Sequence, residues 1–249
     1  QPNVVPDRAT VWYYFREQSY ERIRALHEKG RRVAEGAALM TDTRMSERVL
    51  AGTWPFNGNQ PLAELLQQNI ERVGMPEWSA EDLRLARALQ KELGEPEIGL
   101  ASEVTPLAPA VRSSGTTDAG DVTWLVPYVR LSFPSQIPGA IFHHWSSAVA
   151  VATPLAHKGV LAGAKALAAT VLDLLFDPRK IEPIRARFEE DTRGVTWTSL
   201  IPEHERPPIE LNAEKMARFR PKLERYHYDG ESGKTYLEQL GITYPTVRP

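Results

Sequence analysis

One apolar segment constrains the fold of this chain more than any other. Residues 152–175 read ATPLAHKGVLAGAKALAATVLDLL. Thr153 stands where a helix N-cap is expected, and Pro154 is favoured at the first helical position. Alanines and glycines keep the segment thin, while leucines and valines fall on several of its sides. We therefore expect a buried helix over 153–176 that other parts of the backbone can approach closely.

A histidine, His157, falls in the first turn of this expected helix. The positive end of the helix dipole disfavours a protonated imidazole there, and the neutral imidazole is the form that binds metal ions. From this segment alone, a hydrogen-bonded histidine at a helix end is the simpler interpretation, because most histidines bind no metal.

The bulk composition narrows the classes of function. The 249 residues are 42% hydrophobic and 25% charged, which suits one large globular domain or two smaller ones. A net charge of −2 gives no sign of the positive charge that nucleic-acid binding requires. His157, two lysines and an aspartate within 154–176 argue against a membrane span. The sequence has no cysteine, which excludes disulfides and thiolate metal sites, and we expect a cytoplasmic protein.

Apolar periodicity predicts alternating strands and helices along the chain. The predicted strands are 9–16, 44–59, 122–127, 128–133 and 138–151, and the other predicted helices are 19–39, 60–74, 78–94, 178–191 and 212–226. Ser79 and Asp82 form a capping-box pattern before the third of these helices. Because a predicted strand follows almost directly on Gln1, we expect this chain to be a piece of a longer protein.

Acidic residues precede one of the predicted strands. Asp118 and Asp121 lie in the loop sequence GTTDAGDVTW. Carboxylates on a loop that enters a strand are typical of a site on an α/β sheet. Aspartate and glycine also shape loops without any further role, and the sequence alone favours neither interpretation.

Two more histidines stand before the long apolar helix. His143 and His144 are neighbours, so in a strand at most one of them faces a given pocket. His143 and His157 could share a pocket, but a catalytic zinc normally needs three protein ligands. The sequence contains no HExxH motif. Any metal function of this chain therefore needs ligands from elsewhere.

Four separate motifs resemble those of one enzyme family in order and spacing. They are NVVPD…YYFR at 3–16, GTTDAGDVTWLVP at 115–127, HHW at 143–145 and AHKGVLAGAKALA at 156–168. The chain resembles the C-terminal half of the zinc amidohydrolase and metallocarboxypeptidase family, which includes aminoacylases, auxin-conjugate hydrolases and carboxypeptidase G. Within it, the resemblance is to the branch of the p-aminobenzoyl-glutamate hydrolases.

The resemblance implies an architecture of two interrupted domains. Residues 1–58 would be the second half of an α+β lid and dimerisation domain, and residues 59–249 the C-terminal part of a mixed-sheet α/β catalytic domain. The first half of each domain would lie elsewhere, with most metal ligands and a glutamate general base. We therefore expect a cleaved chain, a companion chain carrying that half, and a homodimer or higher oligomer formed through the lid.

The resemblance also implies roles for individual residues. His157 matches the metal ligand of the C-terminal half. Asn3 and Arg16 match lid residues that reach substrate carboxylates, for which an arginine offers a bidentate fork. Without the resemblance, Asn3 would be a turn residue and Arg16 a solvated strand end. His143 and the loop with Asp118 and Asp121 would line the substrate pocket.

The implied chemistry is metal-dependent hydrolysis of a C–N bond. One or two divalent ions (zinc, manganese or cobalt) would activate water. The expected substrate is an amide of an aromatic or N-acyl amino acid that bears a carboxylate, similar to p-aminobenzoyl-glutamate. One alternative is an aminohydrolase that deaminates a nitroanthranilate-like acid. Another is a non-catalytic binding or regulatory relative that has lost its metal ligands.

Overall fold

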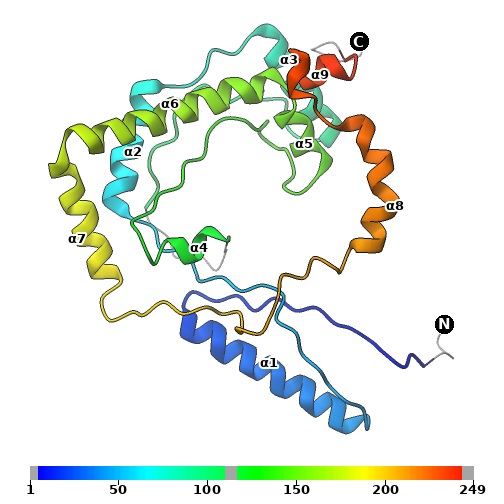
Figure 1. Cartoon of the computed structure of the whole chain (residues 1–249). Coiled ribbons are helices and arrows are strands. Elements are labelled where there is room, and N and C mark those ends of the chain that lie inside the picture. Colours follow the sequence, from blue (N-terminus) through cyan, green and yellow to red (C-terminus); the bar gives the residue numbers. More distant parts are fainter. Residues whose placement is uncertain (1–4, 110–116, 243–249) are drawn as a thin grey trace. The chain divides into compact units, whose positions relative to one another are not determined.

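The computed structural model of the chain describes residues 5–109 and 117–242, and its regular elements are helices (Figure 1). They are α1 (Tyr20–Met40), α2 (Gln60–Val73), α3 (Ala80–Leu93), α4 (Ala119–Val122), α5 (Trp145–Val151), α6 (Pro154–Phe176), α7 (Ile181–Asp191), α8 (Ala213–Leu223) and α9 (Tyr236–Gln239), with 3-10 turns at Pro178–Lys180, Glu224–Tyr226 and Gly230–Ser232. All six predicted helices are confirmed to within a few residues at their ends.

The helix boundaries follow local capping chemistry. Asn59 precedes α2, and its side chain accepts a hydrogen bond from the backbone of Leu62 at 3.1 Å. The capping box of Ser79 and Asp82 is present at the start of α3. Gly94 ends α3 in the left-handed conformation that glycine adopts without strain. These termini are decided by near neighbours in sequence, which is why the pattern predicts them well.

The predicted mixed-sheet α/β fold is wrong for the chain as described, because no strand forms within residues 5–109 and 117–242. The segments predicted as strands at 9–16, 44–59 and 128–133 have no regular secondary structure. The segment predicted at 122–127 begins at the end of the short helix α4, and the one predicted at 138–151 ends as helix α5.

The physical reason is pairing. A strand is stable only when its N–H and C=O groups bond to a neighbouring strand. Apolar alternation predicts a surface that will be half buried, but it does not supply the neighbour. Val11, Trp12, Tyr13 and Tyr14 all remain mostly exposed, at 61 to 79%. Within the described residues, these extended segments find no partner strand.

The chain divides into two compact units, which are described separately. Unit 1 contains the described residues of 1–58, 110–128 and 191–207. Unit 2 contains the described residues of 59–109, 129–190 and 208–249. The assignment of 1–58 to a lid domain and of 59–249 to a catalytic domain stays a prediction.

Unit 2 holds two apolar clusters around α6. The larger one joins α3 and α5 to the first turn of α6, and consists of Leu85, Ala86, Leu89, Leu100, Ile137, Ala150, Leu155 and Ala156. The smaller one joins α2 to α7 through Leu62, Leu65 and Ile184. Helix α6 contacts both α2 and α5, so it is the element that links these parts of the unit.

One face of α6 is packed as closely as the sequence predicts. Its buried residues are Leu155, Ala156, Gly159, Gly163, Ala166 and Thr170. A Cβ atom added to Gly159 would lie 2.2 Å from the carbonyl oxygen of Pro134, and one added to Gly163 would lie 2.9 Å from Cβ of Phe133. The glycines therefore admit the 129–140 segment against the helix, and the predicted close approach is confirmed on this face.

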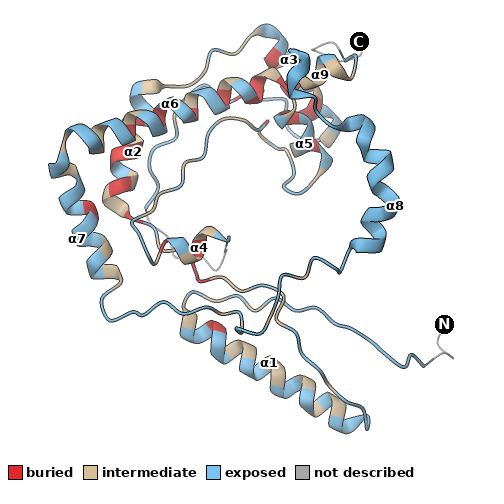
Figure 2. Ribbon diagram, viewed as in Figure 1, coloured by how far each residue is buried: buried red, intermediate tan, exposed pale blue. Residues whose placement is uncertain are grey.

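The opposite face of α6 is uncovered, and the prediction of a fully buried helix is wrong there. We call this surface the open face; it consists of Val160, Leu161, Ala164, Leu167, Ala168, Val171, Leu172 and Leu175, all exposed. Figure 2 shows both buried and exposed colouring along this helix. Within the described residues, α6 is also the one helix long and apolar enough to cross a membrane, and 22% of its apolar window is buried.

Candidate functional site

His157 is in the first turn of α6, as predicted, and its side chain is exposed. Its backbone N–H donates to the carbonyl of Thr153 at 3.4 Å. The hydroxyl of Thr153 donates to the carbonyl of Ala150 at 2.6 Å and makes no cap for α6. The imidazole is therefore carried by an exposed residue on a regular helical turn.

The neighbouring residue fixes this turn to the rest of unit 2. The ammonium of Lys158 donates to the Asp82 carboxylate at 2.5 Å and to the carbonyl of Glu77 at 3.2 Å. The Asp82 side chain is fully buried and also accepts from the backbone of Ser79 at 2.8 Å. One carboxylate thus caps α3 and anchors the start of α6. The sequence pattern identifies Asp82 as a cap, but its partner is 76 residues away and gives no local signal.

The described residues do not by themselves fit a metal centre. No group of three or more histidine, cysteine, aspartate or glutamate side chains suitable for a metal ion occurs in the part of the chain that the structure describes. His157 could contribute one ligand, whereas a catalytic zinc takes three from the protein. Within this part of the chain, the geometry supports a single ligand position and no reaction step through a metal.

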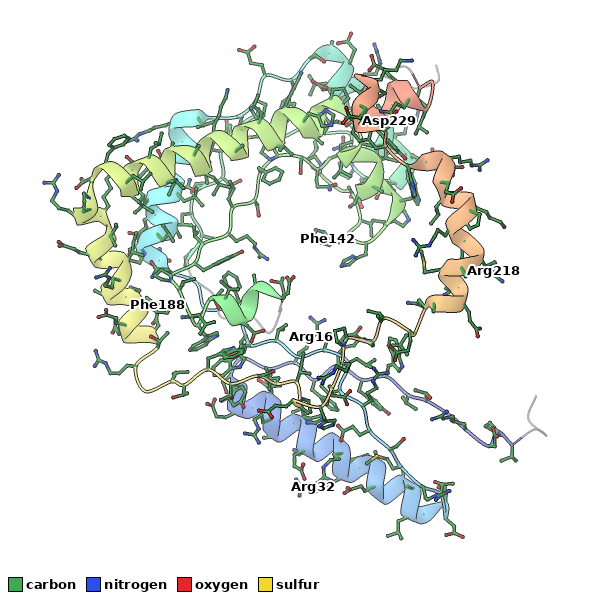
Figure 3. All side chains as sticks on the ribbon, viewed as in Figure 1. Arg16, Arg32, Phe142, Phe188, Arg218 and Asp229 are labelled. Carbon is green, nitrogen blue, oxygen red and sulfur yellow. The ribbon has the colours of Figure 1, made fainter. Side chains whose placement is uncertain are left out.

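His143 lies in a turn before α5 instead of in a strand. Its φ is +57°, a left-handed conformation that is uncommon for a residue other than glycine. The imidazole is exposed beside the ring of Phe142, which is labelled in Figure 3; the ring centroids are 5.3 Å apart. His144 is the N-cap of α5, because its Nδ1 accepts a hydrogen bond from the backbone N–H of Ser146 at 3.4 Å. A role for His143 toward substrate stays a prediction.

Both candidate aspartates of the 117–121 loop have partners within unit 1. Asp118 accepts from the backbone of Ala119 at the start of α4. One carboxylate oxygen of Asp121 accepts from the backbone of Trp54 at 3.3 Å and from the indole of Trp197 at 2.9 Å. Asp121 therefore ties three segments of unit 1 together. These contacts agree with the structural interpretation of the loop, and a substrate role for either aspartate stays a prediction.

An aromatic cluster surrounds this loop in unit 1. The rings of Tyr20 and Trp54 stack with centroids 4.4 Å apart, and Trp124 lies against Trp54 at 5.2 Å. The indole of Trp54 donates to the carbonyl of Thr198 at 2.7 Å. A Cβ atom on Gly120 would lie 2.1 Å from the Trp54 carbonyl oxygen, so only glycine fits there. The TDAGD motif therefore packs directly against the backbone of Trp54.

The two remaining predicted residues belong to the N-terminal segment. Arg16 is exposed, and its guanidinium lies 5.5 Å from the ring centroid of Tyr14 (Figure 3). That position leaves it accessible to a carboxylate from outside the chain. Asn3 lies outside the described residues.

Known proteins similar in sequence to the chain are hydrolases. A p-aminobenzoyl-glutamate hydrolase subunit of Escherichia coli (strain K12) is 29% identical over 232 residues, which covers 83% of this chain and 48% of that protein. The Xaa-Arg dipeptidases of Mus musculus and Homo sapiens are 27% and 26% identical; each match covers 76% of this chain, and 38% and 37% of those proteins. The chain is a homologue of these hydrolases. The family resemblance read from the motifs is thus confirmed.

The match is also partial. The chain spans about half the length, or less, of the curated relatives it matches. No protein-family model matches the chain, and no solved structure matches it. The relatives therefore show that the chain is homologous to hydrolases, and the activity of the whole protein is proposed below.

Proposed function

We propose that this chain is one part of a hydrolase that cleaves a C–N bond, most simply an amide. The observation that carries the proposal is the similarity to named hydrolases over 76 to 83% of the chain. The substrate class is an amide of an aromatic or N-acyl amino acid with a free carboxylate, similar to p-aminobenzoyl-glutamate. The accessible guanidinium of Arg16 suits such a carboxylate.

The proposal includes a companion polypeptide. By this we mean a polypeptide that corresponds to the part of the Escherichia coli p-aminobenzoyl-glutamate hydrolase that this chain does not span, about half of that relative. The described residues offer His157 without a set of co-ligands. We propose that His157 supplies one ligand to a site for one or two divalent ions (zinc, manganese or cobalt), and that the other ligands and a glutamate general base belong to the companion polypeptide. The proposal also includes a cytoplasmic location and a homodimer or higher oligomer formed through residues 1–58, the expected lid domain.

The test is to purify the chain from its native source and to measure bound metal and hydrolysis of p-aminobenzoyl-glutamate on the same material. We expect a second polypeptide, bound divalent metal and hydrolysis. His157→Ala should weaken metal binding at least about tenfold, since loss of even a group that supports a ligand costs about 10- to 100-fold. His227→Ala removes another exposed histidine of unit 2 and is the matched control.

The outcomes separate the parts of the proposal. Unchanged metal binding in His157→Ala would show that His157 is not a ligand. Hydrolysis that survives complete removal of metal would contradict the metal-dependent reaction. A complex that binds metal but releases ammonia from a nitroanthranilate-like acid, without cleaving the amide, would replace amide hydrolysis with deamination.

A further inference from the structure

The open face of α6 is an apolar surface whose eight members are uncharged, and the exposed Lys165 lies at its edge, four residues after Leu161 and seven before Leu172. Its members recur at intervals of three, four and seven residues, so they share one side of the helix. The six large side chains of this face are 44 to 69% exposed. A contiguous exposed apolar surface of this kind marks an interaction site more often than a free surface.

His157 belongs to the same side of the helix. It precedes Val160 by three residues, Leu161 by four and Leu175 by eighteen. At a rise of about 1.5 Å per residue, the row from His157 to Leu175 is about 27 Å long. A partner that covers the whole length of the open face would therefore also lie beside the imidazole.

A lipid bilayer is a poor fit to this helix, despite its length and composition. The opposite face of α6 packs on α2 and on the irregular 129–140 segment, whose Pro134 carbonyl faces Gly159. Irregular backbone carried into a bilayer beside the helix would expose unpaired polar groups to hydrocarbon. In addition, Asp173 near the end of the helix bonds to Lys180 and Asn69.

A second copy of the same chain also fits poorly. It would bring a second His157, but its described residues contain no group of three side chains suited to a metal ion. A polypeptide of different sequence could both bury the open face and supply additional metal ligands beside His157. The part of the relative's length that this chain does not span is large enough to form such a surface, since the match covers 48% of that relative.

We propose that the open face is the docking surface for the companion polypeptide, which covers it with an uncharged apolar surface and brings its metal ligands beside His157. The inference rests on the proposed function, which introduces the companion. The inference adds to that proposal the surface on this chain that the companion contacts. The first turn of α6 is anchored by Lys158 to Asp82 from the flank of the helix, so His157 and the open face are presented outward together.

Site-specific photo-crosslinking in the native complex tests the contact. A benzoylphenylalanine is placed at Leu167 on the open face and, as a control, at Arg218 on α8 in the same unit, which is exposed and labelled in Figure 3. We expect crosslinks from position 167 to the companion, identified by its similarity to the unmatched part of the Escherichia coli relative, and none from position 218. Crosslinks from 167 to lipid or to a second copy of this chain would overturn the proposal.

A charge substitution gives an independent measure. Leu167→Glu should weaken companion binding at least about tenfold, because a carboxylate would be buried in an apolar contact. Since Leu167 is 44% exposed, the fold of the chain should be unchanged by circular dichroism. Ile209→Glu makes the same change at a residue of unit 2 that is 87% exposed, and should leave binding unchanged. Equal binding by the Leu167 variant and the wild type would also overturn the proposal.

The two proposals fail in different ways. If a companion co-purifies and the complex hydrolyses p-aminobenzoyl-glutamate, but position 167 does not crosslink to it, the docking surface is wrong and the proposed function stands. If the companion docks on the open face but the complex hydrolyses nothing, the proposed function is wrong and the docking surface stands. A chain that never associates with such a companion contradicts both.

Discussion

The two faces of α6 are both largely apolar, but their surroundings are opposite. The packed face presents Gly159 and Gly163 to the 129–140 segment, with contacts that leave no room for a Cβ atom. The open face presents valines, leucines and alanines to solvent. An apolar helix is therefore not evidence that all its sides are covered. The small residues indicate where backbone approaches, and the large ones indicate only that something apolar is required.

The largest difference that we expect between the two faces is in the free energy of unfolding when a leucine of each is replaced by alanine. Leu155 is fully buried in the larger cluster, whereas Leu172 on the open face is 51% exposed. Leu155→Ala should lower the free energy of unfolding of the isolated chain by about 3 kcal/mol, from lost burial and the cavity left behind. Leu172→Ala should change it by less than about 0.5 kcal/mol. Chemical denaturation followed by circular dichroism measures both.

The effects of Leu155→Ala and Leu172→Ala on stability can also be compared after the companion has bound. In the complex, Leu172→Ala should become clearly destabilising, because its side chain would then be covered. Equal effects of the two substitutions in the isolated chain would contradict the difference between the faces.

The next largest effect concerns backbone approach. Gly159→Ala should destabilise the chain by about 2 kcal/mol, since the new Cβ would lie 2.2 Å from the Pro134 carbonyl oxygen and the 129–140 segment would have to move. Ala164→Leu adds more atoms to the same helix on the open face, and should change the stability by less than about 0.5 kcal/mol. The thermal unfolding midpoints of both variants provide the measurement. A tolerated Gly159→Ala would mean that the 129–140 segment is loosely held.

The sequence predicts the helices because their signals are local. Asn59, the capping box of Ser79 and Asp82, and Gly94 each act within four residues of the boundary they set. The position of His157 in the first turn of α6 follows from Pro154 in the same way. These parts of the fold and of the candidate site depend on chemistry that a short window contains.

The features that sequence reasoning misses depend on distant partners. The predicted strands need neighbours that the described residues do not provide, so Val11 and Tyr13 stay exposed. The Asp82–Lys158 contact joins residues 76 positions apart, and Asp121 meets Trp54 across 67 positions. Alternation and apolar character report what a segment requires, but they do not report which partner meets the requirement or whether that partner is in the chain.

The smallest effect predicted here concerns a polar contact at the far end of the packed face of α6. The carboxylate of Asp173 accepts from Lys180 and from Asn69, each at 2.8 Å. The hydrogen bond from Lys180, and then that from Asn69, lower the pKa of Asp173. A lowered pKa in the folded state means that the unfolded state binds the proton more readily. The stabilisation is therefore complete above the ordinary aspartate range, near pH 4, and is lost as the pH falls through the lower folded value.

Asp173→Asn should accordingly be less stable than the wild type at pH 7, and its stability should fall less steeply between about pH 5 and pH 2. Denaturation across that range measures the slope. Glu71→Gln removes an exposed carboxylate from α2 and serves as the control. If Asp173→Asn and the wild type lose stability in parallel, the carboxylate contributes nothing through its charge. The hydrogen bond from Asn69 would then hold α2 to α6 as a neutral contact.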